Sequence, residues 1–238
     1  MKVLVVDDDH DVADVVDYVL RRAGFDVVLA HDGPAGLAQF EAEAPDLVIL
    51  DVNLPQMDGI EVCRRIRERS MVPVVMLTVR NDEDDIVNAL QTGADDYVTK
   101  PFSARQLVAR VQALLRRVLA RPEPTSGVSR LVGGPITLDL SAHTVTRNGT
   151  PLRLTPLEFR ILHLLMRHRG QVLSPASIVE HVWGFEGTGN EDLVKVHMHR
   201  LRQKVEADPT RPRLLQTVPG VGYVFRTDDR APVVPSGP

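Results

Sequence analysis

The sequence predicts two domains of different class: an α/β domain built on a five-stranded parallel sheet, followed by a smaller α+β domain. Short runs of Val, Ile and Leu alternate with amphipathic segments through the first half, whereas the second half has strand-like pieces, three helical stretches and a terminal hairpin. Residues 1–119 hold 13 Lys and Arg against 21 Asp and Glu, and residues 120–238 hold 15 against 11. An acidic module is therefore joined to one suited to a polyanion.

The alternation in residues 1–119 predicts five βα units. Apolar runs at Val3–Val6, Leu47–Leu50 and Val74–Leu77 are expected strands, and a further strand is expected near Tyr97–Thr99. Helices are expected near 11–22, 34–43, 57–69, 82–92 and 103–118. Strands that alternate with helices form a parallel sheet covered on both faces, here the doubly wound, flavodoxin-like arrangement.

Polar side chains stand at the carboxyl ends of these strands. Asp51 directly follows the run Leu47–Leu50. Asp7, Asp8 and Asp9 follow the first strand, Thr78 follows Val74–Leu77, and Lys100 follows the fifth strand. Because the carboxyl ends of parallel strands share one edge of the sheet, these groups are expected to converge in a crevice. Such a set suits one phosphoryl group and one hard cation.

The second half predicts a winged helix-turn-helix at residues 133–227. Its expected elements are short strands at Ile136–Leu138 and Thr144–Thr146 with a turn at Asn148-Gly149, helices at Pro156–Arg169, Ser174–Trp183 and Asp192–Glu206, and a hairpin from Leu214–Val218 to Tyr223–Phe225. Trp183 ends an apolar stripe and is expected to pack in the core. Helices followed by a hairpin are typical of this fold.

Residues 120–132 are expected to form a linker, since Arg121–Gly127 is rich in turn-forming residues and lacks periodicity. Residues 228–238 are expected to be a disordered tail. No apolar stretch approaches the roughly 20 residues that a membrane span requires, and no basic, signal-like region opens the chain. The single cysteine, Cys63, is expected to pack in a helix, and the sequence predicts a cytoplasmic protein.

Five strings of the sequence together resemble the two-domain response regulators of the OmpR/PhoB winged-helix family. They are VVDDD, LDVNLPQMDG, GADDYVTKPF, VHMHRLRQK and TVPGVGYVF. The resemblance covers residues 2–226 and implies a receiver domain at 1–119 whose phosphorylation controls a DNA-binding domain. It implies a sensor histidine kinase as phosphodonor, promoter double-stranded DNA as target, a homodimer on phosphorylation, and RNA polymerase as a further partner.

The resemblance assigns roles to the groups at the strand ends. Asp51 is implied as the phosphoacceptor and Mg²⁺ as the cofactor. The implied metal ligands are the carboxylates of Asp8 and Asp51, the backbone carbonyl of Asn53, and Asp7 through a bound water. Lys100 is implied to contact the phosphoryl oxygens, with a cis peptide bond before Pro101 that aims its side chain inward. Thr78 and Tyr97 match the switch pair of the family.

Two other functions compete with this one. Aspartyl-phosphate chemistry also serves phosphatases, in which a second carboxylate two residues after the nucleophile acts as general acid. Asn53 occupies that position here, and an amide cannot donate the proton, so the sequence predicts a protein that is not an enzyme. The remaining alternative is a constitutive DNA-binding regulator whose acidic pocket is unused.

In the resembling family, receiver domains dimerise through ion pairs on the surface formed by their fourth helix, fifth strand and fifth helix. The resemblance assigns two such pairs here, Asp96 with Arg110 and Asp95 with Arg117. A third pair is lost because Ile86 and Gln106 stand where charges are usual. Leu90 and Val108 on the same surface are expected to compensate through apolar contact. The alternative is that these charges are solvated surface groups.

The helix expected at Asp192–Glu206 has the layout of a major-groove reader. One stripe, expected to face the core, consists of Val194, Met198, Leu201 and Val205. The opposite strip consists of Val196, His199, Arg200 and Gln203, flanked by Lys195 and Arg202 on one side and by His197 and Lys204 on the other. The strip is expected to contact base edges, with Arg200 pairing with guanine, and the flanks to contact phosphates. The alternative is a solvated basic face.

The terminal hairpin is expected to act as the wing. Thr217 can offer its hydroxyl to a phosphate group of the DNA. Pro219 stands where the resembling family usually has an arginine that enters the minor groove. The loss of this cation is expected to lower DNA affinity and to flatten its salt dependence by about one unit of slope.

Overall fold

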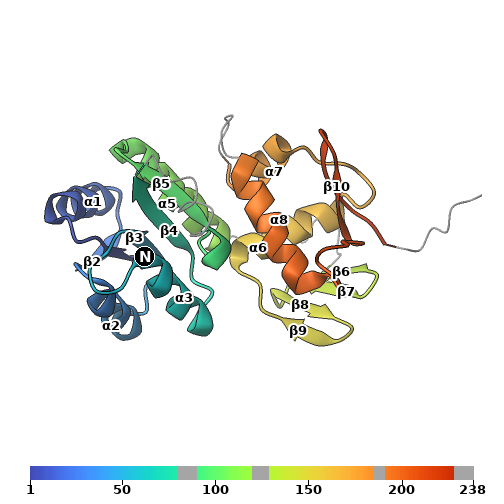
Figure 1. Cartoon of the computed structure of the whole chain (residues 1–238), viewed down its shortest axis with the longest axis horizontal. Helices are drawn as coiled ribbons and strands as arrows, with labels where there is room; N and C mark the ends of the chain where they lie inside the picture. The colour runs from blue at the N-terminus through green and yellow to red at the C-terminus, as the bar shows by residue number, and fades with distance from the viewer. Residues whose placement is uncertain (80–89, 120–128, 185–190, 228–238) are drawn as a thin grey trace, which may run out of the picture. The chain divides into compact units, whose positions relative to one another are not determined.

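The computed structural model describes residues 1–79, 90–119, 129–184 and 191–227. The chain divides into two compact units, Met1–Leu119 and Ala120–Pro238 (Figure 1). The first unit is a five-stranded parallel sheet with helices, and the second is a winged helix. Both predicted fold classes are confirmed.

The sheet of the first unit is parallel throughout and has the order β2-β1-β3-β4-β5. Its strands are β1 (Lys2–Val6), β2 (Asp26–Ala30), β3 (Leu47–Asp51), β4 (Val74–Val79) and β5 (Asp96–Lys100). Every residue of β3 is buried, as expected for a strand covered on both faces. The strand order reverses beside β1, and the crevice at such a switch point lies outside the carboxyl ends of β1 and β3.

Helices cover both faces of this sheet, with α1 (His10–Arg22) and α5 (Ala104–Leu119) on one side and α2 (Gly33–Glu43) and α3 (Gly59–Arg69) on the other (Figure 1). Asp9, Asp32 and Asp58 cap the amino ends of α1, α2 and α3 by accepting hydrogen bonds from backbone N–H groups. The helix predicted at 82–92 falls largely on residues 80–89, which lie outside the described residues. Cys63 is buried in α3, as expected.

The second unit opens with a four-stranded antiparallel sheet of β6 (Arg130–Gly133), β7 (Ile136–Asp139), β8 (Thr144–Arg147) and β9 (Thr150–Leu152). Three helices follow, α6 (Pro156–Arg167), α7 (Pro175–Val182) and α8 (Glu191–Val205). The hairpin of β10 (Leu215–Val218) and β11 (Gly222–Phe225) closes the unit. Trp183 is almost fully buried after α7, which confirms its assignment to the core.

The predicted linker at 120–132 is too long at its carboxyl end. Residues 130–132 belong to β6, because Leu131 and Val132 pair with Leu138 and Thr137 of β7. Residues 120–128 and the predicted tail at 228–238 lie outside the described residues. In the part of the chain that the structure describes, no helix is both long and apolar enough to cross a membrane.

Candidate functional site

The ends of β1 and β3 bring three carboxylates together in an acidic pocket formed by Asp7, Asp8 and Asp51. Each residue offers an oxygen, and these oxygens lie within 4.8 Å of one another. Asp7 and Asp51 are buried, whereas Asp8 is exposed. The three carboxylates thus converge, as the strand-end pattern predicted, with two of them inside the protein and one at the mouth of the pocket.

Lys100, the last residue of β5, reaches into the acidic pocket. Its Nζ donates hydrogen bonds to Oδ2 of Asp51 at 2.6 Å and to Oδ2 of Asp7 at 2.8 Å. Burial raises the pKa of the Asp7 carboxyl, and the hydrogen bond from Lys100 only partly opposes this effect. Burial alone lowers the pKa of Lys100, but its bonds to Asp51 and Asp7 outweigh this and raise the pKa above its usual value. The peptide bond between Lys100 and Pro101 is cis, as the resemblance implied.

The acidic pocket fits Mg²⁺ by donor type and by charge. Its carboxylate oxygens are the hard ligands that Mg²⁺ takes in proteins. Three ionised carboxylates and one ammonium leave a charge of about −2, which a divalent cation offsets. The backbone N–H of Asn53 donates to Oδ1 of Asp51 at 3.2 Å, so the segment after β3 folds back toward the pocket.

α3 packs closely on the end of β3. Gly59 is the first residue of this helix, and a Cβ atom there would lie 1.9 Å from the backbone oxygen of Asp51. The Gly59 N–H donates to the carbonyl of Val52 at 2.9 Å. Only glycine permits this approach, which fixes the backbone of the phosphoacceptor candidate against the helix.

The two predicted switch residues lie on neighbouring strands. Thr78 of β4 is buried, and its register partner on β5 is Thr99. Tyr97 of β5 is half-buried and aligns with Met76.

Most of the predicted dimer contacts are already engaged or buried within one chain. Asp96 is fully buried and forms a 2.6 Å ion pair with Arg110 of the same chain. Asp95 pairs with Arg67 at 2.6 Å within the unit. Leu90 is fully buried, so it is not the exposed apolar residue that the sequence predicted. The acids at the start of β5 thus have cations inside their own unit, and ion pairs between two receiver units stay a prediction.

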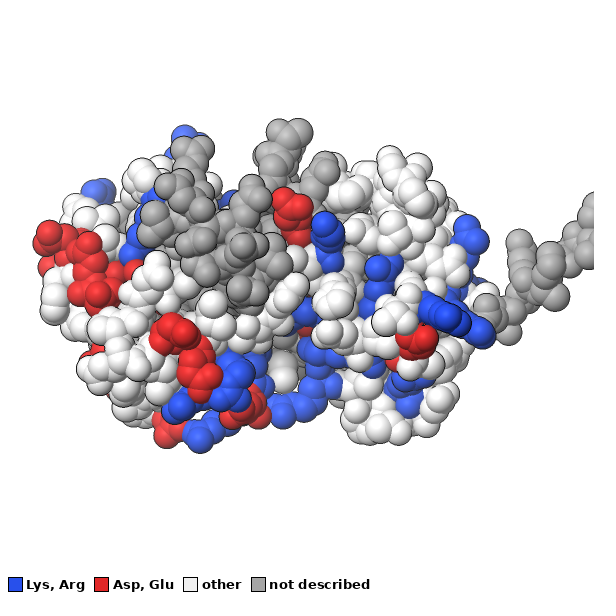
Figure 2. Space-filling model, viewed as in Figure 1, with Lys and Arg blue, Asp and Glu red and all other residues white. Residues whose placement is uncertain are grey.

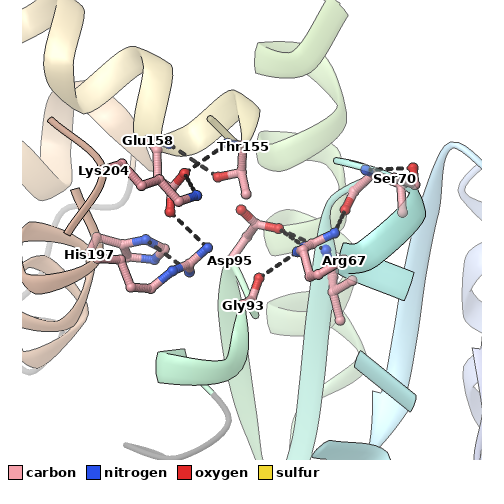
Figure 3. Close-up of polar contacts among 11 residues, drawn as sticks. Arg67, Ser70, Gly93, Asp95, Thr155, Glu158, His197 and Lys204 are labelled. Carbon is pink, nitrogen blue, oxygen red and sulfur yellow. Dashed lines mark hydrogen bonds and ion pairs between the residues drawn. The ribbon is translucent and has the colours of Figure 1, made fainter. Parts of the chain in front are cut away.

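Arg67 makes several contacts with the same region of the sheet, besides its pair with Asp95 (Figure 3). Its Nε donates to the carbonyl of Gly93 at 2.8 Å, and a second guanidinium nitrogen donates to the carbonyl of Val72. Asp95 also accepts from the N–H of Val74 at 2.9 Å. Of the remaining predicted dimer positions, Gln106 is exposed and Val108 half-buried. Ile86 and the side chain of Arg117 lie outside the described residues.

α8 carries most of the predicted DNA contacts, but its buried face is broader than expected. His197 is fully buried with its ring 5.3 Å from that of Trp183, and Arg200 and Val196 are buried as well. The reason is that α8 packs against both α6 and α7. Val196 and Arg200 therefore do not face outward as predicted, and His197 is not the exposed flanking residue that the sequence predicted. The outward stripe is Asp192, Lys195, His199 and Gln203, spaced three or four residues apart.

Two cations of α8 are paired with a carboxylate inside the unit. Glu158 of α6 is fully buried and forms ion pairs with Arg200 at 2.9 Å and with Lys204 at 2.6 Å. Arg200 is thereby corrected from a guanine reader to a buried partner of Glu158. Lys204, predicted to contact phosphate, is half-buried and engaged in the same way.

The end of α8 is tied to the hairpin. Arg202 donates from Nε to the carbonyl of Leu215 at 2.9 Å and from a terminal nitrogen to the Thr217 hydroxyl at 2.7 Å. Glu206 accepts hydrogen bonds from the N–H groups of Arg213, Leu214 and Leu215 at 3.1, 2.9 and 2.7 Å. Thr217 remains exposed, whereas the guanidinium of Arg202, predicted as a phosphate contact, is directed at β10.

The charge of the surface follows the split in the sequence. On the face shown in Figure 2, acidic side chains gather over the first unit, and Lys and Arg side chains outnumber them over the second. A basic surface is the electrostatic requirement for binding a nucleic acid.

Each of the two units matches a known protein family. Residues 3–112 match the response regulator receiver domain, and residues 149–225 match the C-terminal domain of transcriptional regulatory proteins. The chain is a response regulator of the OmpR/PhoB type. Response regulators of this family take a phosphoryl group from a histidine kinase and bind DNA.

Individual relatives extend over nearly the whole regulator. The sensory transduction protein RegX3 of Mycolicibacterium smegmatis is 44% identical over 221 residues, which cover 93% of this chain and 97% of RegX3. The DNA-binding response regulator MtrA of the same organism is 47% identical over 222 residues, covering 93% of this chain and 95% of MtrA. The crystal structure of DrrB, an OmpR/PhoB homologue from Thermotoga maritima, is 34% identical with a TM-score of 0.50, covering 94% of this chain and 98% of DrrB.

Sequence reasoning missed three residues that organise this response regulator: Arg67, Glu158 and Glu206. A signal existed for Glu158, because Thr155 and Glu158 have the spacing of a capping box. The spacing indicates the cap of α6 but not the pairing with α8. Arg67 and Glu206 bind backbone atoms brought near by folding, which no local pattern indicates.

Proposed function

We propose that phosphorylation of Asp51 by a sensor histidine kinase controls dimerisation of the receiver unit and sequence-specific binding of promoter DNA by the winged helix. The acidic pocket is the observation that carries this proposal. Asp51 is a buried carboxylate with two further carboxylates within 4.8 Å and the ammonium of Lys100 at 2.6 Å. These are the groups that an acyl-phosphate site needs.

In the transfer step, an Asp51 carboxylate oxygen forms the new bond to phosphorus. The bond from phosphorus to the imidazole nitrogen of the kinase breaks, and its electron pair stays with the imidazole, which takes a proton from solvent. Lys100 already lies at Oδ2 of Asp51, so its ammonium is placed beside the incoming phosphoryl oxygens.

The metal site of the proposal consists of Asp8, Asp51 and the backbone carbonyl of Asn53, with Asp7 holding a metal-bound water. When bound, Mg²⁺ supplies positive charge that offsets repulsion between the carboxylates and the phosphoryl group. Asp7 and Asp51 are held in place by Lys100, and Asp8 at the pocket mouth is accessible to an entering ion.

The proposed switch uses Thr78 and Tyr97. The Thr78 hydroxyl moves toward the phosphoryl group, and the Tyr97 ring moves inward to fill the space that it leaves. The burial of Thr78 and the half-buried position of Tyr97 on the adjacent strand support this role. The resulting change in the receiver surface biases a monomer–dimer equilibrium toward the dimer.

In the DNA-binding unit, the outward stripe of α8 is proposed to enter the major groove. Gln203 and His199 can contact base edges, and their side-chain nitrogens lie 3.0 Å apart. Lys195 is exposed and can neutralise a phosphate, as Thr217 can bind one from the hairpin. A dimer then occupies neighbouring half-sites, with RNA polymerase as a further partner.

The test measures DNA affinity on genomic promoter fragments at fixed salt, with and without Mg²⁺ and a small-molecule phosphodonor. Wild type is compared with Asp51→Ala and with the control Asp26→Ala, which removes an exposed carboxylate from β2. A donor-dependent gain in wild type and in the control, but not in Asp51→Ala, is the expected result. Equal binding under all conditions would instead identify a constitutive regulator.

A further inference from the structure

Glu158 is a fully buried carboxylate on α6 that receives two cations from one face of α8. Arg200 lies 2.9 Å from Oε1, and Lys204 lies 2.6 Å from Oε2 (Figure 3 shows Glu158 with Lys204). Only 6% of the Arg200 side chain is exposed, so its pair is desolvated, whereas the Lys204 side chain is 32% exposed. Of the two ion pairs of Glu158, the one with Arg200 is therefore buried and the one with Lys204 lies near the surface.

The position of Glu158 is set independently of α8. Glu158 is the third residue of α6 and completes a capping box with Thr155. The Thr155 N–H donates to Oε2 of Glu158 at 2.9 Å, and the Glu158 N–H donates to the Thr155 hydroxyl at 3.3 Å. The capping box therefore holds the carboxylate at the amino end of α6 without any contribution from α8.

The two cations are four residues apart, which places them on the same side of α8. Because both meet a single fixed carboxylate, they restrict rotation of α8 about its own axis. Apolar packing alone is non-directional and restricts such rotation less. Successive residues of a helix are about 100° apart around its axis. A rotation of α8 by a fraction of that angle therefore changes the direction in which its outward stripe points.

The ring of His197 extends the same contact into the core. Its Nδ1 lies 3.5 Å from a guanidinium nitrogen of Arg200, and the ring packs at 5.3 Å from that of Trp183. Trp183 is the one tryptophan of the chain and is 1% exposed. Because Trp183 packs against His197 of α8, its fluorescence reports on the position of this helix.

We propose that Glu158 is a positioning residue for DNA recognition: it sets the rotation of α8 so that Lys195, His199 and Gln203 face the DNA together. This inference rests on the proposed function, because it concerns the same DNA-reading helix. It assigns to Arg200 and Lys204 the task of holding α8, and it leaves base discrimination to the exposed stripe. A carboxylate that never touches DNA thereby determines which bases are read.

The test uses Glu158→Gln in the full chain. Glutamine keeps the capping box, since its side-chain oxygen also accepts from the Thr155 N–H, but it removes the charge that holds Arg200 and Lys204. The matched control is Val145→Ala, which truncates a buried residue of β8. Urea unfolding followed by Trp183 fluorescence gives the stability of the second unit for each variant.

Two DNA probes measure discrimination: the duplex that wild type selects from a randomised pool, and poly(dI-dC). We expect the affinity ratio for the two probes to fall about tenfold in Glu158→Gln, the equivalent of one base contact. Affinity for poly(dI-dC) should change little, because the basic surface remains. Trp183 emission in the folded state should shift in Glu158→Gln, while Val145→Ala keeps the wild-type ratio and emission.

Two results would overturn the inference. One is wild-type discrimination in Glu158→Gln, and the other is an equal loss of discrimination in Val145→Ala. If wild type itself selects no duplex, the proposed function fails, and Trp183 emission still decides the positioning role. In that case a shift confined to Glu158→Gln supports the role, and its absence refutes it.

Discussion

Substitutions at Asp96 and Arg110 can show whether this ion pair stabilises a single receiver unit or joins two receiver units. Asp96 is fully buried, and the guanidinium of Arg110 lies 2.6 Å from one carboxylate oxygen and 2.8 Å from the other. We consider Arg110→Met, which keeps an unbranched side chain of moderate length but removes the cation. The carboxylate of Asp96 then stays buried without its guanidinium.

Removing one partner of a buried ion pair costs about 3–5 kcal/mol. Folding free energies of whole domains are only about 5–15 kcal/mol, so this is a large share of the stability of the receiver unit. The double variant Asp96→Leu, Arg110→Met removes both charges, and such replacements are close to neutral. We therefore expect the double variant to be more stable than the single variant.

The destabilisation of Arg110→Met should depend on pH. Burial raises the pKa of Asp96 above its usual value, and Arg110 opposes this rise. A raised folded-state pKa means that the native state binds the proton more tightly than the unfolded state. Stability from this group is then present below about pH 4 and is lost as pH rises through the folded pKa. Without Arg110 the pKa of Asp96 rises further, so the stability of Arg110→Met should recover as pH falls through the folded-state pKa toward about 4.

Native-state hydrogen exchange measures these differences on the full chain, because the amides of β4 and β5 report opening of the receiver unit. The loss should be the same at low and high protein concentration, since the pair lies within one chain. A loss below about 1 kcal/mol, or one that appears only at concentrations where dimers form, would refute the assignment.

Three further predictions concern single positions. Gly59→Ala should destabilise the receiver unit by about 1–3 kcal/mol in hydrogen exchange and reduce phosphorylation, because its Cβ would meet the Asp51 backbone oxygen at 1.9 Å; unchanged exchange would contradict this. Asp8→Asn should weaken Mg²⁺ binding about tenfold in calorimetry through loss of a carboxylate ligand, while Asp9→Asn, which changes only the α1 cap, serves as the control. Lys195→Ala should flatten the salt dependence of DNA binding by about one unit of slope, and an unchanged slope would show that Lys195 meets no phosphate.

The acidic pocket could be predicted from sequence because its physics is local to each strand. An apolar run identifies a buried strand, and the next polar residue, such as Asp51 or Lys100, must emerge at its carboxyl end. Parallel strands then bring these ends to one edge without any knowledge of side-chain contacts. Local periodicity likewise predicted α1, α2, α3 and α5 of the first unit and, through an apolar stripe, the core position of Trp183.

The exposed and buried faces of α8 could be predicted only in part. The helical wheel located the apolar stripe of α8 but not its width, because the width depends on how many neighbouring helices cover it. The wheel also placed each cation at the surface, whereas Arg200 is buried and paired with Glu158, which lies 42 positions earlier in the chain. The choice of Arg67 as the partner of Asp95 is likewise a property of the folded chain. Partners of buried charges are set by tertiary packing and leave no periodic signal.

The hydrogen bonds of Arg202 and Glu206 join the end of α8 to β10, and we expect the helix and the hairpin to move as one body. If α8 enters the major groove as proposed, the distance between that groove and the DNA backbone contacted by the hairpin is fixed by the protein. The duplex must then supply any adjustment by bending or by changing its groove width, at an elastic cost that depends on base sequence. Operators of this regulator are therefore expected to be selected partly for deformability, at base pairs that no side chain touches.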